Sequence, residues 1–315
     1  MRALALDGSV RFRTDYPKPS ASGTDVLVRV LTAGICETDL QLIKGYMGYG
    51  GVLGHEFVGV AENGSLAGRR VVGEINCACG ACDLCARGLP THCLNRSVLG
   101  IVNHDGAFAD YLLLPQRNLH AVPDSIPNEI AVFTEPVAAA FQILVQVNVT
   151  RTDRVIVLGD GRLGNLCAQV LARVADDTLV IGKHPEKLAL LRRCGIRTTL
   201  LADAPRDRRA DIVVDCTGSE SGLPAAISLV RPRGTIVLKT TVAGTQTMPW
   251  APFVIDEISL IGSRCGPFDR ALFALERGEV EVRPLIQERL PLDRGVEALD
   301  LASQRLKVLL TVAEG

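Results

Sequence analysis

The segment that most constrains the fold is a glycine motif, G-D-G-R-L-G at residues 159–164. It follows an apolar run, residues 154–158, that has the composition of a buried strand, and it precedes a helical pattern at residues 163–174. In a strand–turn–helix unit, the first glycine permits a tight turn, the second lets the backbone approach a pyrophosphate, and the third lets the helix pack on the strand. The motif predicts a dinucleotide-binding fold.

The region around this motif differs in sequence pattern from the rest of the chain. Residues 137–265 alternate between expected strands and helices, which predicts a parallel, doubly wound sheet covered on both faces. Residues 1–136 and 266–315 instead contain short β-rich runs broken by glycines, the rhythm of an irregular β domain. We therefore expect two domains with these boundaries. The strands expected after the first are residues 178–181, 211–215, 235–238 and 258–261.

Four cysteines form a second motif, with the spacing C-x2-C-x2-C-x7-C. Thiols at this spacing can surround one zinc ion tetrahedrally. Disulfides are the alternative, but the N-terminus reads M-R-A-L-A-L-D and does not resemble a secretory leader, so we expect a cytoplasmic protein with reduced thiols. The spacing predicts a closed zinc site and leaves Cys77 outside it. Its expected ligands are Cys79, Cys82, Cys85 and Cys93.

Composition excludes two classes of partner. The formal net charge of -1 offers no basic face for nucleic acid. The longest apolar stretch, residues 131–149, contains Glu135, Pro136 and three amide side chains, so it does not fit a membrane span. We expect neither a nucleic-acid partner nor a membrane partner.

The end of the second strand bears on the choice of dinucleotide. NAD-binding folds place an acidic residue about 20 residues beyond the glycine motif, where it binds the ribose hydroxyls. Here the chain reads V-I-G-K-H-P, without a carboxylate. Gly182 leaves room for a 2′-phosphate, and Lys183 and His184 can pair with it. NADP(H) is favoured over NAD(H); the alternative is that Lys183 and His184 form an ordinary solvated turn.

A second set of metal-binding side chains is spread over three short segments, G-I-C-E-T-D, G-H-E-F-V-G and T-E-P-V. They contribute Cys36, His55 and Glu135, a ligand set that suits zinc with one coordination position left open for chemistry. Taken singly, each has a structural explanation: a core thiol, a core histidine and a carboxylate at a helix start. Together they predict a catalytic metal site.

In this order along nearly the whole chain, the motifs resemble the zinc-dependent medium-chain dehydrogenase/reductase family, which includes alcohol, sorbitol and threonine dehydrogenases. G-A-F-A-D-Y before E-P-V and D-C-T-G after the glycine motif extend the match. The resemblance implies a GroES-like β catalytic domain for residues 1–136 and 266–315. It also implies a Rossmann cofactor domain for residues 137–265.

The resemblance further implies roles for individual residues. Cys36, His55 and Glu135 would hold a catalytic zinc, while Glu56 is a ligand in some relatives and a neighbour of the ligands in others. Thr38 matches the hydroxyl that passes on the substrate proton. The four-cysteine motif would hold a structural zinc, which makes two zinc ions per chain. The implied cofactor-binding residues are Gly159, Gly161, Arg162, Leu163, Gly164, Lys183, His184 and Thr217.

Two positions depart from the family pattern. Glu37 replaces the usual glycine and predicts an extra carboxylate near the zinc, and Gln41 stands where many alcohol dehydrogenases carry a relay histidine. The expected reaction is hydride transfer between a zinc-bound alcohol or carbonyl and NADP(H), with a small alcohol, polyol, aldehyde or ketone as substrate. The resemblance also implies a homodimer or homotetramer, associated near residues 258–261.

Two other functions remain open. One is a zinc-independent NADPH reductase of the same fold, although such relatives usually lack both the ligand trio and the four-cysteine motif. The other is a non-catalytic NADPH-binding regulatory protein whose metals serve stability alone. The metal content separates them from the dehydrogenase, which requires two zinc ions per chain.

Overall fold

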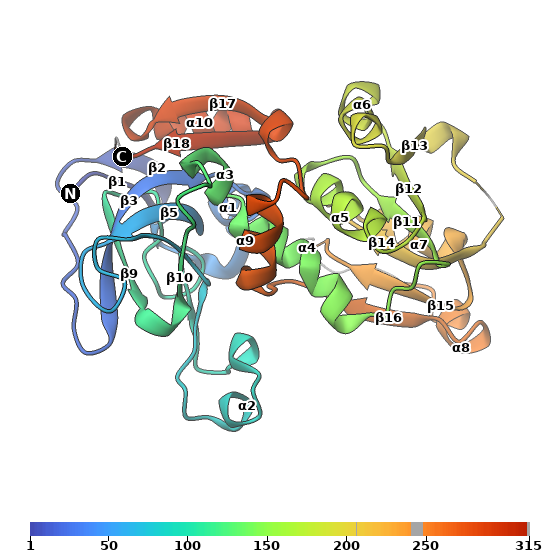
Figure 1. Cartoon of the computed structure of the whole chain (residues 1–315), viewed down its shortest axis with the longest axis horizontal. Coiled ribbons are helices and arrows are strands. Elements are labelled where there is room, and N and C mark those ends of the chain that lie inside the picture. The colour runs from blue at the N-terminus through green and yellow to red at the C-terminus, as the bar shows by residue number, and fades with distance from the viewer. Residues whose placement is uncertain (206, 241–247, 314–315) are drawn as a thin grey trace. The chain divides into compact units, whose positions relative to one another are not determined.

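The computed structural model describes residues 1–205, 207–240 and 248–313. It divides into two units, the first formed by Met1–Glu135 with Phe268–Gly315 and the second by Pro136–Pro267 (Figure 1). Residues 314–315, which end the range expected for the catalytic domain, lie outside the described residues.

Unit 1 is built from short strands. Among the described residues they form a three-stranded sheet in the order β2-β1-β4, a seven-stranded sheet along the path β10-β6-β5-β3-β18-β17 with β9 paired to β3, and the pair β7-β8. The strands are β1 (Ala3–Asp7), β2 (Ser9–Arg13), β3 (Asp25–Gly34), β4 (Gly51–Val52), β5 (Glu56–Ala61), β6 (Arg70–Gly73), β7 (Asn76–Cys77), β8 (Ser97–Val98), β9 (Tyr111–Pro115), β10 (Leu119–Ala121), β17 (Ile286–Pro291) and β18 (Lys307–Thr311).

Strand β3 organises unit 1 because it pairs with three other strands. It is antiparallel to β5, β9 and β18, and its side chains alternate between buried and half-buried positions. Val28 and Val30 are fully buried in the core beneath it. Near its C-terminal end, Gly34 is opposite Glu56 of β5 and Leu309 of β18, so three distant chain segments meet there.

Helices in unit 1 are short and occupy the connections between strands. The segment that holds the four cysteines, with α2, forms a lobe that extends from the β-sheets of this unit (Figure 1). The helices are α1 (Glu37–Ile43), α2 (Asp83–Ala86), α3 (Asn128–Ala131), α9 (Phe268–Glu276) and α10 (Gly295–Ala302); α4 (Thr134–Gln146) begins in unit 1 and continues into unit 2.

Unit 2 contains the parallel sheet that the glycine motif predicts. Its described strands form one six-stranded sheet in the order β13-β12-β11-β14-β15-β16, with every neighbouring pair parallel. This is the 3-2-1-4-5-6 order of dinucleotide-binding folds, so the expected fold class is confirmed. The strands are β11 (Arg154–Leu158), β12 (Asp177–Gly182), β13 (Arg197–Leu200), β14 (Ala210–Asp215), β15 (Val230–Leu238) and β16 (Ser259–Gly262).

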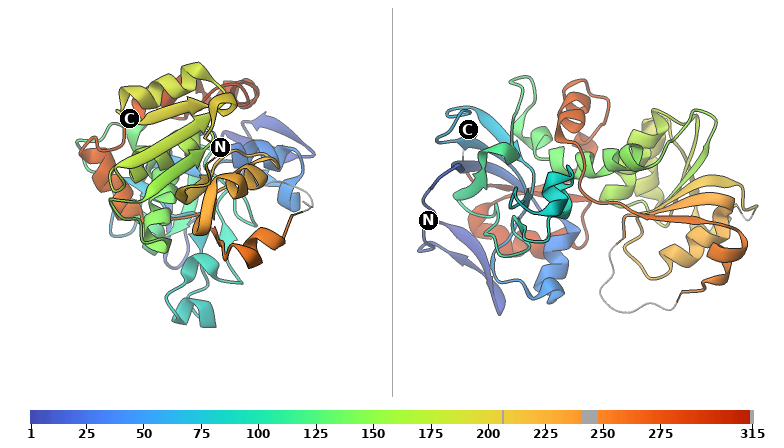
Figure 2. Two further views of the ribbon diagram at one scale, coloured as in Figure 1. Left: turned by 90° about the vertical axis from the view of Figure 1, so that its right-hand side faces the viewer. Right: turned by 90° about the horizontal axis from the view of Figure 1, so that it is seen from below.

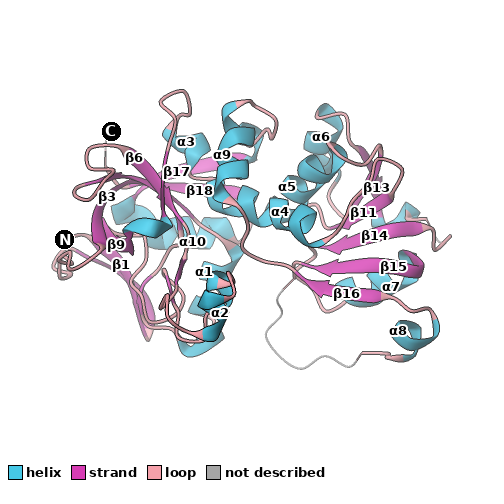
Figure 3. Ribbon diagram, turned by 60° about the horizontal axis from the view of Figure 1, so that its bottom comes forward, coloured by secondary structure: helices cyan, strands magenta, loops and turns pink. Residues whose placement is uncertain are grey.

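Helices pack against the strands in both halves of this sheet. Helices α5 (Arg162–Ala172) and α6 (Pro185–Arg193) pack on β11–β13, and α7 (Gly222–Leu229) packs on β14 and β15 (Figure 3). Figure 2 shows the twist of the sheet from two further directions. Helix α8 (Ala251–Ile255) precedes the edge strand β16. The sequence analysis missed β13, whose polar sequence R-T-T-L lies at the opposite edge of the sheet, with Arg197 exposed and the other three residues half-buried.

Among the described residues, no helix is both long enough and apolar enough to cross a bilayer.

Candidate functional site

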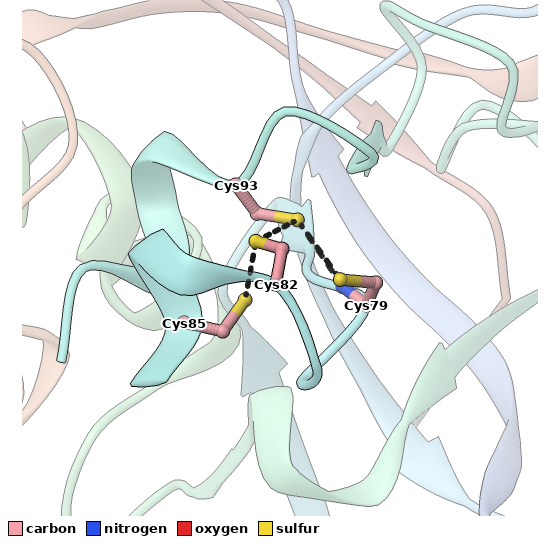
Figure 4. Close-up of side chains that lie close together, drawn as sticks. All are labelled: Cys79, Cys82, Cys85 and Cys93. Atoms are coloured by element: carbon pink, nitrogen blue, oxygen red, sulfur yellow. Dashed lines mark hydrogen bonds between the residues drawn. The ribbon is translucent and has the colours of Figure 1, made fainter. Parts of the chain in front are cut away.

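The four cysteines of the α2 lobe gather their sulfur atoms at one point, as Figure 4 shows. The Sγ–Sγ distances are 3.5 Å for Cys79–Cys93, 3.5 Å for Cys82–Cys85 and 3.7 Å for Cys82–Cys93. A tetrahedron with Zn–S bonds of about 2.3 Å has edges of about 3.8 Å. The cluster therefore fits a zinc ion, and the spacing is far too long for disulfide bonds.

The lobe favours the thiolate form, which binds metal, at Cys79, whereas burial raises the pKa of the Cys85 thiol to about 11. Hydrogen bonds from the backbone amides of Ala81 and Cys82 lower the pKa of the Cys79 thiol to about 6. Cys77 is not a member of the cluster, because the ligand atoms within 4.8 Å of one another belong to the four motif cysteines alone among the described residues.

A second cluster lies in unit 1 where α1 and β5 begin. Cys36 precedes α1, His55 precedes β5, and Glu56 is the first residue of β5. Their ligand atoms all lie within 4.8 Å of one another, and His55 and Glu56 are almost fully buried. A thiol, an imidazole and a carboxylate brought together in the interior form a donor set that suits zinc.

Asp39, which the sequence analysis did not single out, holds two of these residues in place. Its Oδ2 accepts a hydrogen bond from the backbone N–H of Cys36 at 2.8 Å, and its Oδ1 lies 3.3 Å from His55 Nδ1. Neither Oδ1 nor Nδ1 has another hydrogen-bond partner within the part of the chain that the structure describes. The contact leaves the other ring nitrogen of His55 available to a metal.

The charge on Asp39 also changes the protonation of the histidine. Burial by itself lowers the pKa of His55, but the Asp39 carboxylate outweighs burial and raises the pKa well above its ordinary value. Asp39 is itself fully buried, so its charge acts on His55 without screening by solvent.

Glu56 is paired with a lysine from the far end of the chain. The ammonium of Lys307, the first residue of β18, donates hydrogen bonds to Glu56 Oε2 and, at 3.2 Å, to the carbonyl oxygen of Ile35. It also lies 5.4 Å from the centre of the Phe133 ring. Both charged side chains are only 2% exposed, so each depends on the other to offset its loss of hydration.

Gly34 makes room for this ion pair. A Cβ atom at residue 34 would lie 2.6 Å from Glu56 Oε2 and 2.8 Å from Lys307 Nζ. Because real Cβ atoms do not approach other atoms so closely, any larger residue would displace the pair. Lys307 carries no sequence signal, and Gly34, although it opens the G-I-C-E-T-D motif, acquires this role through strand pairing between distant segments.

The remaining residues expected near Cys36 take different positions. Thr38 Oγ1 lies 3.9 Å from Cys36 Sγ, so its hydroxyl borders the cluster. Glu135 lies in the first turn of α4 and does not belong to the cluster of Cys36, His55 and Glu56 within the described residues. Glu37 accepts a hydrogen bond of 3.0 Å from the Gln41 amide, so these two unusual residues contact each other on α1.

The glycine motif of unit 2 has the geometry that a dinucleotide requires. Gly159 has a φ of 110°, and a Cβ there would meet the carbonyl oxygen of Cys216 at 2.6 Å. A Cβ at Gly164 would lie 2.1 Å from the carbonyl oxygen of Gly159, which shows how closely α5 packs on the turn. At Gly161 an added Cβ would meet no atom within 4 Å. The backbone at the N-terminus of α5 is thus open to an anion.

The strand end that follows the motif holds a carboxylate that the sequence analysis did not expect there. Asp160, from the glycine motif itself, accepts hydrogen bonds from the backbone N–H groups of Lys183 and His184 at 2.7 and 2.6 Å. Its Oδ1 also lies 3.0 Å from His184 Nδ1. The Lys183 side chain is exposed and has no ion-pair partner among the described residues.

Thr217 is held by a buried carboxylate at the end of β14. Its backbone N–H and its hydroxyl both donate to Asp215 Oδ1, at 2.9 and 2.8 Å. The same oxygen accepts a hydrogen bond from the hydroxyl of Thr240, the second residue after β15. Asp215 therefore fixes the loops that follow two neighbouring strands, at the edge where doubly wound sheets bind ligands.

The comparisons with known proteins agree with this geometry. A model described as alcohol dehydrogenase GroES-like domain matches residues 22–124, and one described as zinc-binding dehydrogenase matches residues 163–276. L-threonine 3-dehydrogenase of Chelativorans sp. is 30% identical over 88% of each chain. Erythritol/L-threitol dehydrogenase of Mycolicibacterium smegmatis is 27% identical over 96% of this chain and 94% of its own.

Among solved structures, the rspB alcohol dehydrogenase of Escherichia coli CFT073, complexed with NADH, is similar over 99% of both chains. The TM-score is 0.89 at 27% sequence identity. The fold, the order of the motifs and two clusters of side chains that could hold a metal ion thus occur together in one chain that is similar to these named dehydrogenases.

Proposed function

The chain belongs to the zinc-dependent medium-chain dehydrogenase/reductase family, and we propose that it is a zinc-dependent dehydrogenase of a small alcohol or polyol that uses NADP(H). It is an oxidoreductase of the alcohol dehydrogenase type. The observation that carries the zinc dependence is the convergence of Cys36, His55 and Glu56, whose ligand atoms lie within 4.8 Å of one another in the interior of unit 1. A structural protein has no need of such a donor set beside a separate four-cysteine cluster.

Cys36 and His55 would hold a zinc ion with one carboxylate, that of Glu135 or of Glu56, as the third ligand, which leaves one position open for the substrate oxygen. The ion supplies Lewis-acid polarisation of an alcohol or carbonyl oxygen. Asp39 orients His55 and fixes the backbone of Cys36, so two ligands depend on one buried carboxylate. Such support restricts the motion of ligands that come from separate elements.

Thr38 is the residue we assign to proton transfer. Its hydroxyl lies beside Cys36 and can accept the proton that the alcohol loses and donate its own proton onward. The relay histidine of many relatives is absent, and Gln41 donates to Glu37 instead. The proton therefore leaves by a path that does not use residue 41 as a base.

The cofactor would bind along the carboxyl ends of the unit 2 strands. Gly159, Gly161 and Gly164 form the turn, and the pyrophosphate would lie at the N-terminus of α5, where Arg162 and Leu163 begin the helix. NADP(H) is supported by the exposed ammonium of Lys183, while the space expected at Gly182 for a 2′-phosphate is filled by the Asp160 side chain. Thr217 borders this edge of the sheet.

The substrate class follows from the family and from the named relatives. Threonine and erythritol, named for two of them, are small molecules with hydroxyl groups on short carbon chains. We propose a small alcohol, polyol or amino alcohol, or the corresponding carbonyl compound. A panel of these compounds, assayed with NADP+ and NAD+ in parallel, tests the proposal. Turnover only with NAD+ would contradict the cofactor assignment, and no turnover of any alcohol would contradict the substrate class.

We further propose that the protein assembles as a homodimer or homotetramer through β16. Among the described strands, β16 pairs only with β15, so its outer edge has no partner. The nearby helix α8 exposes apolar side chains, with Val254 76% and Ile255 78% exposed. A second copy would pair with this edge and cover α8.

Sedimentation velocity of the Ile255→Glu variant tests this interface. We expect the substitution to shift the protein toward the monomer, while Leu94→Glu, in the equally exposed cysteine lobe, leaves assembly unchanged. Full assembly of Ile255→Glu would contradict the proposed contact.

A further inference from the structure

At the end of β12, the side chain of Asp160 occupies the space that a side chain at residue 182 would need. A Cβ atom at Gly182 would lie 2.4 Å from Asp160 Oδ2 and 2.6 Å from Asp160 Cβ. Residue 182 is the last residue of β12, the position from which an acidic side chain binds the ribose hydroxyls in NAD-binding folds. Here a carboxylate from the glycine motif fills that space.

The Asp160 carboxylate is fully engaged by the turn it faces. Oδ2 accepts the backbone N–H groups of Lys183 and His184, and Oδ1 faces the His184 ring at 3.0 Å. Its side chain is only 8% exposed. Burial opposes ionisation of Asp160, but hydrogen bonds from His184 and the two amides outweigh it and lower its pKa. The carboxylate is thus ionised, shielded and committed to protein donors.

We propose that Asp160 and Gly182 are a coupled pair that determines specificity at the 2′ position of the cofactor. The Asp160 side chain requires glycine at residue 182 and thereby excludes an acidic side chain from the strand end. It also holds the turn that presents Lys183 to solvent, where an ammonium can pair with a 2′-phosphate. This inference rests on the proposed function, because it assumes that the glycine motif binds a dinucleotide.

Because Asp160 and Gly182 are coupled, an acidic residue at position 182 should not by itself change the cofactor from NADP(H) to NAD(H). In an ordinary fold of this type, Gly182→Asp would supply the carboxylate that NAD(H) requires. In this chain the new side chain would clash with Asp160 and place two carboxylates together. Conversion to NAD(H) should therefore require removal of Asp160 as well.

Fluorescence titration with NADPH and NADH tests the pair on the purified full chain, with the variants Asp160→Ala, Gly182→Asp and the double variant. We expect Gly182→Asp to weaken binding of both cofactors by at least about tenfold, which corresponds to about 1.4 kcal/mol. The double variant should recover NADH binding and favour NADH over NADPH. Wild-type NADPH affinity in Gly182→Asp, or no recovery of NADH binding in the double variant, would overturn the proposal.

Thermal unfolding of the variants measures the coupling between Asp160 and Gly182 without any cofactor. Gly182→Ala adds only the clashing methyl group, so it should lower the melting temperature by several degrees, and the double variant with Asp160→Ala should lose less than the two single losses combined. Additive losses would refute the coupling. If the wild-type chain binds neither nucleotide yet this cycle is non-additive, the proposed function fails while the pairing of Asp160 and Gly182 stands.

Discussion

The ammonium of Lys307 is hydrogen bonded to the carboxylate of Glu56, and the two residues lie 251 positions apart in the chain. The pair fastens the start of β18 to the start of β5, directly behind Cys36 and His55. Since both side chains are buried, removal of either one leaves a charge without a partner in the interior of unit 1. The cluster of Cys36, His55 and Glu56 and the contact between the starts of β5 and β18 therefore share one ion pair.

Substitution of Lys307 by methionine should destabilise the protein by roughly 3 kcal/mol, because an unpaired buried carboxylate remains at Glu56. Urea unfolding of preparations with equal metal content measures the effect. The double variant Glu56→Gln with Lys307→Met removes both charges and should recover part of the loss. A Lys307→Met protein within about 0.5 kcal/mol of wild type would show that the pair has no structural role.

Asp39→Asn should reduce kcat while leaving the fold intact. An amide keeps an oxygen for the N–H of Cys36 but loses the charge that faces His55, so the ligand is held less firmly. Loss of such a partner typically costs about 10-fold to 100-fold in activity or metal affinity. Steady-state kinetics with metal analysis on the same samples measures both. Unchanged kcat together with unchanged zinc content would refute the assigned role of Asp39.

Removal of one thiol from the α2 lobe should release one zinc ion and leave the other. We expect Cys82→Ser to contain one zinc per chain, measured by mass spectrometry of the metal, and to melt at a lower temperature than wild type. Cys77→Ser is the matched control, since Cys77 lies outside the cluster, and it should keep both ions. Two zinc ions in Cys82→Ser would contradict the four-cysteine site.

His120 should make stability depend on pH. Its ring lies 2.9 Å from Glu74 Oε1 and 3.1 Å from Asp269 Oδ1, and it stacks on Phe268 at the start of α9. Burial lowers the pKa of His120, but hydrogen bonds to Glu74 and Asp269 outweigh burial and raise it above the ordinary value. The stabilisation is thus complete below about pH 6.5 and is lost as pH rises through the raised pKa.

Unfolding of wild type and His120→Gln at several pH values measures this effect. The free-energy difference between the two proteins should be about 1 kcal/mol at pH 6, where the hydrogen bonds are charge-assisted, and should shrink at pH 9. A difference that does not change with pH would contradict the assignment of a charged His120.

Much of unit 2 could be predicted because its signals are local. The apolar run of β11, the three glycines and the following helix are contiguous, so the strand–turn–helix unit is visible without tertiary information. Strand β13 was missed because its polar sequence R-T-T-L lies at an edge and carries no apolar pattern. The carboxylate beside Gly182 was missed because Asp160 reaches that position only after folding.

In unit 1, the contacts that support Cys36, His55 and Glu56 could not be predicted from local sequence signals. The residue types of Cys36 and His55 are visible as ligands, and their motifs predicted a cluster with Glu135, whereas the carboxylate of the cluster among the described residues is Glu56. Lys307 is an ordinary charged residue in the sequence, and the pairing of β3 with β5 and β18 places it against Glu56. Asp39 contacts the backbone of Cys36 locally, at the start of α1, but it reaches His55 only after folding. The contacts of Asp39 with His55 and of Lys307 with Glu56 join separate segments of the chain, so they form only on folding. The residue types that can bind a metal are visible in the sequence itself.

The most direct test of the account is alcohol oxidation by Cys36→Ser, followed as NADPH formation with metal content measured on the same preparation. We predict one zinc per chain, retained in the α2 lobe, a folded protein by circular dichroism, and loss of turnover with every alcohol that wild type oxidises. A zinc-independent reductase or a regulatory protein would differ already in the wild type, with a single zinc per chain. Turnover by Cys36→Ser at the wild-type rate would contradict the proposed catalytic zinc site.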